Sequence, residues 1–248
     1  MLLEDGERLE DLECNGLKII QNKNFYTFTS DSVLLANFVE TRSSDVCVEI
    51  GTGCGVISIL LSAKTKFKKM YAFELQKEMA LLAEKSVKLN GLESLIEVVE
   101  DDILNFERHI SKGSVDCVVS NPPYMLACGK NENSIRDKAR HENSLPVDKL
   151  CMAASQLLKE GGKFFVVYAA SRACELIFNL MKNRLEPKRM FFSSNGKGKV
   201  MLVVIEAVKG GKHEVKVLPE LVTNDSDGKY LEQLHTKYVN KRGQYESL

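Results

Sequence analysis

The sequence predicts an α/β protein whose core is a doubly wound, mostly parallel sheet of seven strands. Short apolar runs alternate along the chain with longer segments of helical period, which is typical of parallel strands covered by helices on both faces. The expected parallel strands are residues 45–50, 69–75, 96–101, 115–120 and 163–169. Two further runs, 189–194 and 199–208, are joined by a linker too short for a parallel crossover, so they predict a closing antiparallel hairpin.

Turn residues indicate where the intervening helices begin and end. The segment 76–92 has helical spacing and stops at Asn90 and Gly91, a pair suited to a left-handed C-cap. Pro146 suits the start of the next helix, which is expected to end at the glycine pair 161–162. The last core helix is expected over residues 171–185.

Two additions flank this core. Near the N-terminus, Asn15 and Gly16 have the residue types of a hairpin turn, and a helix capped by Ser30 or Asp31 should follow. After the hairpin the chain turns at a second Gly-Gly pair and becomes polar. We therefore divide the chain into an N-terminal addition at 1–44, a core domain at 45–222 and a tail at 223–248.

Composition narrows the classes of protein and partner. With 248 residues and 44% hydrophobic residues, the chain can build one substantial core. The formal net charge is zero, so a nucleic acid would have to meet a local basic patch. The seven cysteines lack metal-ligand spacing, which favours reduced thiols and no metal. Neither a leader-like start nor an apolar span is visible, so we expect a cytoplasmic protein without membrane contact.

Three glycines follow the first predicted strand and precede a helix. Gly51, Gly53 and Gly55 allow backbone N–H groups and the helix N-terminus to approach a ligand closely. Their G-x-G-x-G spacing differs from the dinucleotide-binding G-x-G-x-x-G pattern. Glu49 precedes them inside the apolar strand, and a buried carboxylate needs partners, so it should hold loop N–H groups or a cationic ligand group.

Acids at the next two strand ends complete this pattern. Glu74 is placed to accept hydrogen bonds from ribose hydroxyls, although this feature alone suits NAD equally well. An acid in the "EDD" segment, Asp102 rather than Asp101, is placed for an adenine amino group. A parallel sheet that closes with an antiparallel hairpin resembles the Rossmann-like S-adenosylmethionine-dependent methyltransferases, and that resemblance implies S-adenosyl-L-methionine as the cofactor of these residues.

The segment "NPPY" follows the fourth strand, which should lie beside the first strand where the strand order reverses. Pro122 and Pro123 stiffen the peptide and remove backbone donors, leaving the Asn121 side-chain oxygen and the Pro122 carbonyl as acceptors beside Tyr124. This set suits a planar amino nitrogen held for in-line methyl transfer, with Tyr124 stacked on its ring.

A narrower resemblance rests on "FTSDSVLLANFV", "VEIGTGCGVISILLSAK", "DDI", "VVSNPPY" and "ARHE". Together they resemble the bacterial tRNA1(Val) (adenine(37)-N6)-methyltransferases over most of residues 10–210. The resemblance implies methylation of adenosine 37 in the anticodon stem-loop of a valine tRNA. It also implies that Asn121, Pro122 and Tyr124 hold the flipped base, while the glycine loop, Glu49, Glu74 and Asp102 hold the cofactor.

Cations for the RNA come next in the sequence. Arg136, Lys138 and Arg140 follow the NPPY segment and are candidate phosphate contacts, and Lys197 and Lys199 lie on the predicted hairpin. Charged loops are often only solvated, so this interpretation stays open. For assembly, we expect a monomer or a weak dimer.

Rival functions use the same acceptors. A methyltransferase acting on the glutamine amide of release factors is the nearest alternative, although such enzymes usually carry a longer helical N-terminal domain. An rRNA guanine-N2 or adenine-N6 methyltransferase is a second alternative. A non-enzymatic module that binds S-adenosylmethionine and RNA is a third, and the NPPY segment argues against it.

Overall fold

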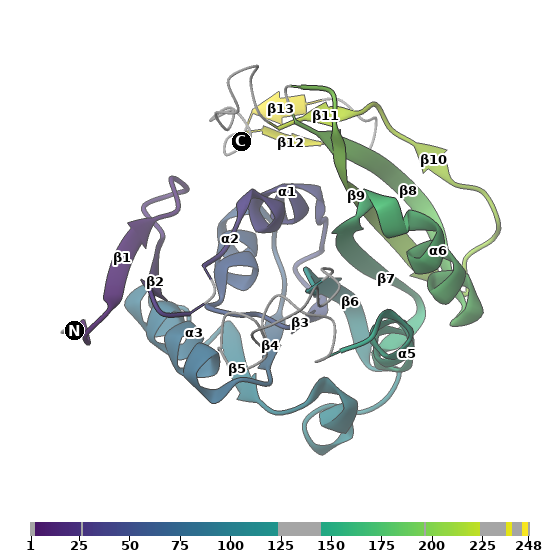
Figure 1. Cartoon of the computed structure of the whole chain (residues 1–248). Coiled ribbons are helices and arrows are strands. Elements are labelled where there is room, and N and C mark those ends of the chain that lie inside the picture. Colours follow the sequence, from purple (N-terminus) through teal and green to yellow (C-terminus); the bar gives the residue numbers. More distant parts are fainter. Residues whose placement is uncertain are drawn as a thin grey trace, which may run out of the picture.

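The computed structural model describes residues 3–25, 27–123, 145–195 and 197–223, together with the backbone of 237–239 and 245–247. Its central sheet has the strand order β10-β8-β9-β7-β6-β3-β4-β5 (Figure 1). The seven core strands are β3 (Val46–Ile50), β4 (Lys69–Glu74), β5 (Ile96–Glu100), β6 (Val115–Ser120), β7 (Leu158–Ala169), β8 (Leu185–Ser194) and β9 (Val200–Lys209).

The predicted strand directions are confirmed. Strands β5, β4, β3, β6 and β7 run parallel, and β9 lies antiparallel to both β7 and β8. A parallel sheet needs helical connections, and the chain supplies them. The helices are α1 (Ser30–Phe38), α2 (Val56–Lys64), α3 (Lys77–Leu89), η1 (Ile103–Arg108), α5 (Val147–Leu157), η3 (Ala170–Arg172) and α6 (Ala173–Lys182).

Helices cover both faces of the sheet, which explains the nearly continuous apolar strands (Figure 1). On β3, Cys47 packs into a core shared with α1, α2 and α3, whereas its neighbour Val48 packs into a core shared with α5 and α6. Successive side chains of a strand point to opposite faces, so each position of β3 must be apolar unless it has another task. Glu49 is the exception.

The sheet is wider than predicted. Two short strands, β10 (Lys216–Val217) and β11 (Leu221–Val222), pair with β8, so the sheet has nine strands among the described residues. The second Gly-Gly turn, at Gly210 and Gly211, leads the chain back along β8. Without these strands β8 would be an open edge, and open edges expose unpaired backbone groups.

The boundary between α5 and β7 also differs from the prediction. The helix ends at Leu157, and β7 begins at Leu158, so Gly161 and Gly162 lie inside the strand. The pairing of β7 with β6 shifts register between Leu158 and Lys163, and Gly161 has a φ of 78°. The glycines therefore form an irregular, bulged stretch of strand instead of ending the helix.

The N-terminal elements pack on the core as a hairpin and a helix. Strands β1 (Glu7–Asp11) and β2 (Lys18–Asn22) pair antiparallel, and Asn15 and Gly16 both have positive φ in the predicted turn. The predicted helix is present as α1, but the predicted cap at Ser30 or Asp31 was wrong, because the helix begins at Ser30 and its N-cap is Thr29, which makes no side-chain cap hydrogen bond. The chain division at residues 44 and 222 stays a prediction.

The tail contains a second small ladder. Strands β12 (Lys237–Val239) and β13 (Tyr245–Ser247) pair antiparallel, and β12 lies beside α1 (Figure 1). Among the described residues, no helix is long and apolar enough to cross a membrane.

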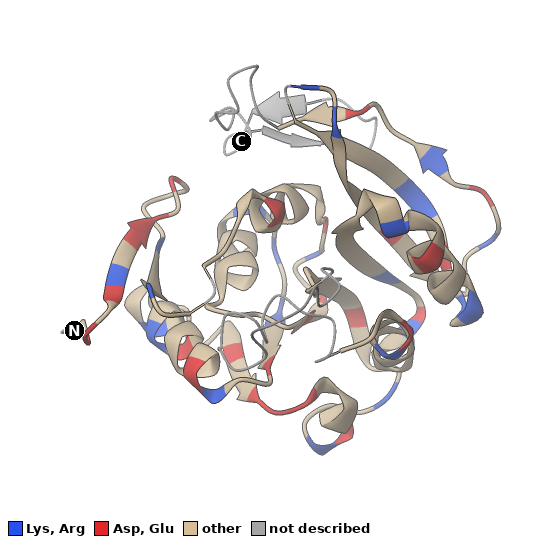
Figure 2. Cartoon of the chain, viewed as in Figure 1, with Lys and Arg blue, Asp and Glu red and all other residues tan. Residues whose placement is uncertain are grey.

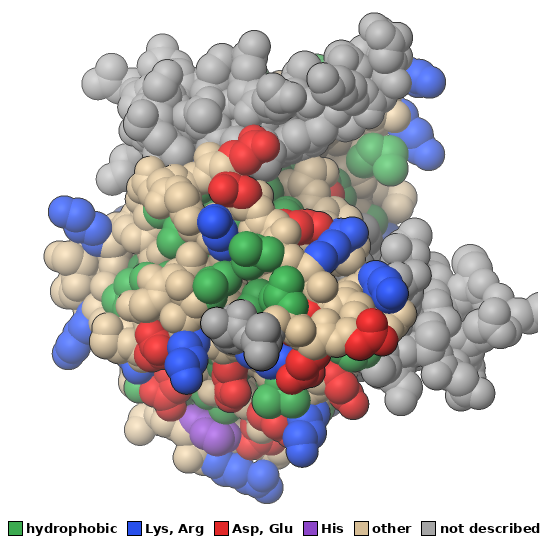
Figure 3. Space-filling view, turned by 90° about the vertical axis from the view of Figure 1, so that its left-hand side faces the viewer, with side chains coloured by type: hydrophobic (Ala, Val, Ile, Leu, Met, Phe, Trp, Pro, Cys, Tyr) green, Lys and Arg blue, Asp and Glu red, His purple; other side chains and the backbone are tan. Residues whose placement is uncertain are grey.

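Charges of both signs are distributed over the molecule (Figure 2). On the face that carries the β1–β2 hairpin and α3, acidic and basic side chains alternate (Figure 3). There, Lys85 pairs with Glu4 and Glu7, and Arg8 pairs with Glu10. The described residues of this face carry charges of both signs and do not form the basic surface that RNA binding requires.

Candidate active site

The candidate site lies where β3 and β6 end side by side. Ile50 pairs with Ser120 in the sheet, and the Ser120 hydroxyl donates a hydrogen bond of 2.9 Å to the Ile50 carbonyl. The next residues, Gly51 and Asn121, therefore leave the sheet at the same edge. The strand order reverses here, because β4 lies on one side of β3 and β6 on the other. This is the predicted switch point, where open α/β sheets bind ligands.

The glycine loop is tied to the neighbouring strand. The N–H groups of Gly51 and Thr52 both donate to the Phe73 carbonyl of β4, at 3.0 and 2.9 Å. Gly51 has a φ of 74°, which favours glycine, and a Cβ built on it would meet no atom within 4 Å. Gly55, with a φ of 91°, is the N-cap of α2. The loop is thus fixed to β4 by two backbone hydrogen bonds, and Gly51 faces open space.

Glu49 is fully buried beneath this loop. Its Oε2 accepts hydrogen bonds from the Thr52 hydroxyl at 2.8 Å, the Ser58 N–H at 3.0 Å and the Ser58 hydroxyl. Its Oε1 has no hydrogen-bond partner among the described residues. Burial raises the pKa of Glu49 to about 7, and hydrogen bonds from Ser58 and Thr52 offset part of that rise. One carboxylate oxygen is therefore desolvated and unsatisfied.

Glu74, at the end of β4, holds the glycine loop. Its Oε2 accepts from the Gly53 N–H at 2.8 Å, and its Oε1 accepts from the Gln76 N–H at 2.9 Å. We expected Glu49 to hold loop N–H groups or a cationic ligand group, and it is Glu74 that holds the Gly53 N–H. Burial raises the pKa of Glu74, and these backbone bonds lower it. Because a carboxylate offers about four acceptor positions, Glu74 retains capacity for further donors.

The two acids after β5 differ in their bonds. Asp101 accepts from the Asp102 N–H at 2.8 Å, the Asn105 amide at 2.9 Å and the His109 ring at 2.9 Å. Hydrogen bonds from Asn105 and His109 lower the pKa of Asp101 to about 2. Asp102 caps η1 through Oδ1, which accepts from the Leu104 N–H at 2.9 Å, and its Oδ2 has no bond among the described residues. Of the two acids, Asp102 is therefore the one with a carboxylate oxygen that can still accept a hydrogen bond.

Asn121 follows β6 and contacts α1. Its amide nitrogen Nδ2 donates a hydrogen bond of 3.0 Å to the Ser32 hydroxyl oxygen, while Oδ1 accepts none among the described residues. Pro122 is buried and Pro123 is half-buried. Of the other predicted residues, Tyr124, Arg136, Lys138 and Arg140 lie outside the described residues.

Three hydroxyl residues of the site were missed at the sequence level. Thr52 and Ser58 bind Glu49, and Ser32 binds Asn121. Ser32 belongs to the "FTSDS" segment that carries the family resemblance, but nothing in its local pattern indicates what it contacts. The position of Thr52 inside the glycine loop was the available signal for its role.

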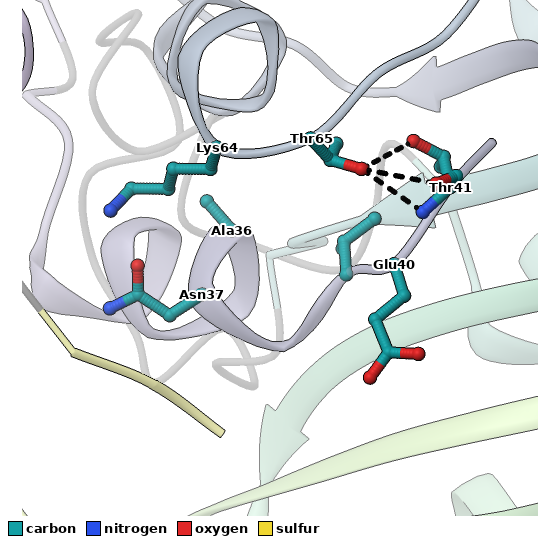
Figure 4. A pocket seen from close by; sticks show the side chains of 7 residues that line it. Ala36, Asn37, Glu40, Thr41, Lys64 and Thr65 are labelled. Carbon is teal, nitrogen blue, oxygen red and sulfur yellow. Dashed lines mark hydrogen bonds between the residues drawn. The ribbon is translucent and has the colours of Figure 1, made fainter. Parts of the chain in front are cut away.

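A separate hollow lies at the C-terminal ends of α1 and α2 (Figure 4). Its volume is about 240 Å³, and the Thr41 and Thr65 hydroxyls, 2.8 Å apart, close one wall. Lys64 and Glu40 both line it, and burial lowers the pKa of Lys64. The lining contains none of the predicted site residues, and its mixed charge favours no single class of ligand.

Comparison with known proteins identifies similar sequences. The family model of the methyltransferase small domain matches residues 27–196. A Bacteroides fragilis (strain YCH46) protein named tRNA1(Val) (adenine(37)-N6)-methyltransferase is 27% identical over 213 residues, which cover 85% of this chain and 90% of that protein. A protein of the same name from Photorhabdus laumondii is 32% identical over 139 residues, covering 56% and 57% of the two chains. These similarities confirm the resemblance seen in the sequence motifs.

Solved structures share the fold at low identity. A predicted O-methyltransferase from Agrobacterium tumefaciens has a TM-score of 0.63 and 19% identity, with 82% of this chain and 93% of that chain covered. M. jannaschii TYW2, solved in complex with AdoMet, has a TM-score of 0.57 and 17% identity, with 84% and 87% covered. They confirm the predicted methyltransferase-like sheet.

Proposed function

The chain belongs to the methyltransferase small domain family, and on that premise we propose that it methylates N6 of an adenine in tRNA, using S-adenosyl-L-methionine. The expected target is adenosine 37 of a valine tRNA, because relatives that are 26–32% identical have that activity in their names. The observation that carries the proposal is the Asn121 amide oxygen, which accepts no bond among the described residues and follows the strand beside the glycine loop.

The residues present fit this cofactor. Among the described residues, one buried carboxylate oxygen of Glu49 has no hydrogen-bond partner, which suits the cationic ammonium group of a methionine moiety. Gly51 faces open space, so the loop can meet a ligand through its backbone. Glu74 retains acceptor positions for ribose hydroxyls, and Asp102 retains Oδ2 for the adenine amino group. When bound, S-adenosylmethionine supplies a methyl group on a positively charged sulfur.

Asn121 and Pro122 act on the acceptor amine. The exocyclic nitrogen of adenine is a weak nucleophile, because its lone pair is delocalised into the ring. Two acceptors, Asn121 Oδ1 and the Pro122 carbonyl, would hold its two hydrogens and direct the lone pair at the methyl carbon. Tyr124 would stack on the extruded base. Catalysis then depends mainly on positioning, and an in-line arrangement of reacting atoms can lower a barrier substantially.

RNA would be held by cations near the carboxyl ends of the parallel strands, where the candidate site lies. The β8–β9 hairpin turns at this edge, because its strand β9 pairs with the carboxyl end of β7 at Ala169 and Leu202. Lys197 and Lys199 are exposed in that turn. With Arg136, Lys138 and Arg140 they would contact the phosphates of the anticodon stem-loop. A tRNA substrate also favours the cytoplasm; a monomer or weak dimer stays our expectation.

The test is methyl transfer to RNA. Purified protein is incubated with methyl-labelled S-adenosylmethionine and unmodified tRNA, and the digested nucleosides are identified by mass spectrometry. We expect labelled N6-methyladenosine from a valine tRNA. Labelled N2-methylguanosine would identify guanine as the substrate base in place of adenine. Label only on release-factor glutamine would support the alternative activity. Label on none of these would contradict an enzymatic function.

Asn121→Ala serves as the matched variant in the same assay. Its S-adenosylmethionine affinity should stay close to that of the unmodified protein, because Asn121 faces the acceptor amine. Methyl transfer should fall by roughly a hundredfold, as expected when a reacting group loses its alignment. Loss of cofactor binding together with transfer would instead place Asn121 in the cofactor pocket.

A further inference from the structure

We propose that Ser32 is a positioning residue for methyl transfer, because it fixes the plane and position of the Asn121 side-chain amide. This inference rests on the proposed function and assigns a role to a residue outside the NPPY segment. Ser32 itself would not touch the substrate. It acts through one hydrogen bond, donated by Asn121 Nδ2 to the Ser32 hydroxyl oxygen over 3.0 Å.

The orientation of an amide is otherwise poorly determined. The oxygen and nitrogen ends of an asparagine side chain have nearly the same size, so packing alone hardly distinguishes them, and hydrogen-bond partners decide. Asn121 has a partner on one end only, since Oδ1 accepts no hydrogen bond among the described residues. A flipped amide would present two N–H donors to an amine that is itself a donor. The Ser32 hydroxyl can donate as well as accept, so the contact itself fixes the plane and position of the amide, and the need of Oδ1 to accept from the amine favours the orientation seen in the structure.

Ser32 is suited to this task because it is itself fixed. It is 4% exposed and lies in the first turn of α1. Farther along the helix, the Phe38 ring packs edge-on against Phe165 and Phe191, with centroids 5.9 and 5.1 Å apart. A side chain on a well-packed helix positions its partner more reliably than one on a loop.

The far end of α1 is also anchored. The Arg189 guanidinium of β8 lies 4.8 Å from the Phe38 ring centroid and forms a 3.1 Å ion pair with Glu40. Both anchors join α1 to the sheet that carries Asn121. The position of the amide is therefore fixed relative to the core of the protein. Ser32 and Asn121 achieve this although they are 89 residues apart in the sequence.

The first experiment separates positioning from folding by steady-state kinetics. Ser32→Ala should lower kcat about five- to tenfold, the change expected when one net hydrogen bond is lost. The S-adenosylmethionine Kd, the KM for tRNA and the Tm should stay close to those of the unmodified protein. Ser32→Thr retains the hydroxyl oxygen and should recover kcat. Ser30→Ala, a half-buried serine of the same helical turn, should leave kcat unchanged.

Two kinetic outcomes would overturn the proposal. One is a kcat for Ser32→Ala equal to that of Ser30→Ala. The other is a joint loss of kcat, cofactor affinity and Tm, which would indicate that Ser32 only supports the fold.

A second measurement needs no catalysis. In 15N-labelled protein, the side-chain amide signals of Asn121 are assigned by their loss in Asn121→Ala, and Ser32→Ala should shift them whereas Ser30→Ala should not. Unmoved signals would refute the contact whether or not the protein methylates tRNA. Shifted signals together with no transfer to tRNA would contradict the proposed function and leave the Ser32–Asn121 contact standing.

Discussion

Glu206 and Glu49 are both buried in the central sheet, and their surroundings differ. Glu206 of β9 is 4% exposed, its Oε1 lies 3.0 Å from the Lys163 ammonium, and its Oε2 bonds to the Arg189 guanidinium. Glu49 of β3 is fully buried, but its donors are uncharged and one of its oxygens has no partner among the described residues.

The difference distinguishes a structural acid from a candidate functional one. A buried carboxylate is costly, and at Glu206 two cations offset that cost. At Glu49 the hydrogen-bond donors among the described residues are uncharged, and burial raises its pKa to about 7. The fold thus keeps an unfavourable group beside an open glycine loop. We infer that the missing cation belongs to the ligand.

The largest expected effect comes from breaking the Glu206 cluster. Glu206→Ala leaves Lys163 without its acidic partner and Arg189 with Glu40 alone, so the free energy of unfolding should fall by about 3 kcal/mol, measured by urea denaturation. Replacing Glu206 and Arg189 together by methionine should recover more than half of that loss, because similar-sized apolar side chains pack without a charge. A loss below about 1 kcal/mol for Glu206→Ala would show that the cluster is not structural.

The pH dependence of the free energy of unfolding should reveal the titration of Glu49. Burial raises its pKa in the folded state from 4.5 to about 7. Its favourable contribution is therefore complete below pH 4.5 and is lost as the pH rises through 7. Over that range the unmodified protein should lose on the order of 3 kcal/mol of unfolding free energy relative to Glu49→Gln, measured by urea denaturation.

Glu74 is present in both proteins, so the part of its contribution that is independent of Glu49 cancels. Its charge also raises the pKa of Glu49, so the difference between the two stability curves includes the repulsion between these two acids. Parallel stability curves for the unmodified protein and Glu49→Gln would show that Glu49 does not titrate in this range.

For cofactor affinity the order of the two glutamates should be reversed: Glu49 should matter and Glu206 should not. Glu49→Gln should weaken S-adenosylmethionine binding about thirtyfold, since losing the partner of a buried cation costs about 2 kcal/mol or more. Isothermal titration calorimetry above pH 7 measures this change. Glu206→Gln should leave the Kd unchanged in the folded protein. Equal Kd values for the unmodified protein and Glu49→Gln would remove Glu49 from the cofactor site.

The smallest effect concerns one neutral donor. Thr52→Val keeps the side-chain shape and removes the hydroxyl that donates to Glu49 at 2.8 Å. Because that bond stabilises the ionised carboxylate, its loss should lower stability by about 1 kcal/mol at pH 8 and have less effect at pH 5, where Glu49 is protonated. An equal loss at both pH values would attribute the effect to packing rather than to the charge.

Local sequence patterns were sufficient for much of the fold. Apolar runs, turn glycines and a short linker predicted five parallel strands and the closing hairpin, and the structure confirms them. Prediction failed where a local signal had two meanings. The pair Gly161 and Gly162 suits a helix end, but the pairing of β7 with β6 placed it in a bulged strand.

The candidate site divides in the same way. The sequence by itself determined which residues lie at the carboxyl ends of the strands, because parallel strands end together and Gly51 and Asn121 each follow a strand. Only the tertiary structure decided the hydrogen-bond partners of these residues. Glu74 binds the Gly53 N–H, Ser58 binds Glu49, and Ser32 binds Asn121. The physical reason is that a hydrogen bond extends about 3 Å. Such contacts depend on how distant segments pack, and no local pattern encodes that packing.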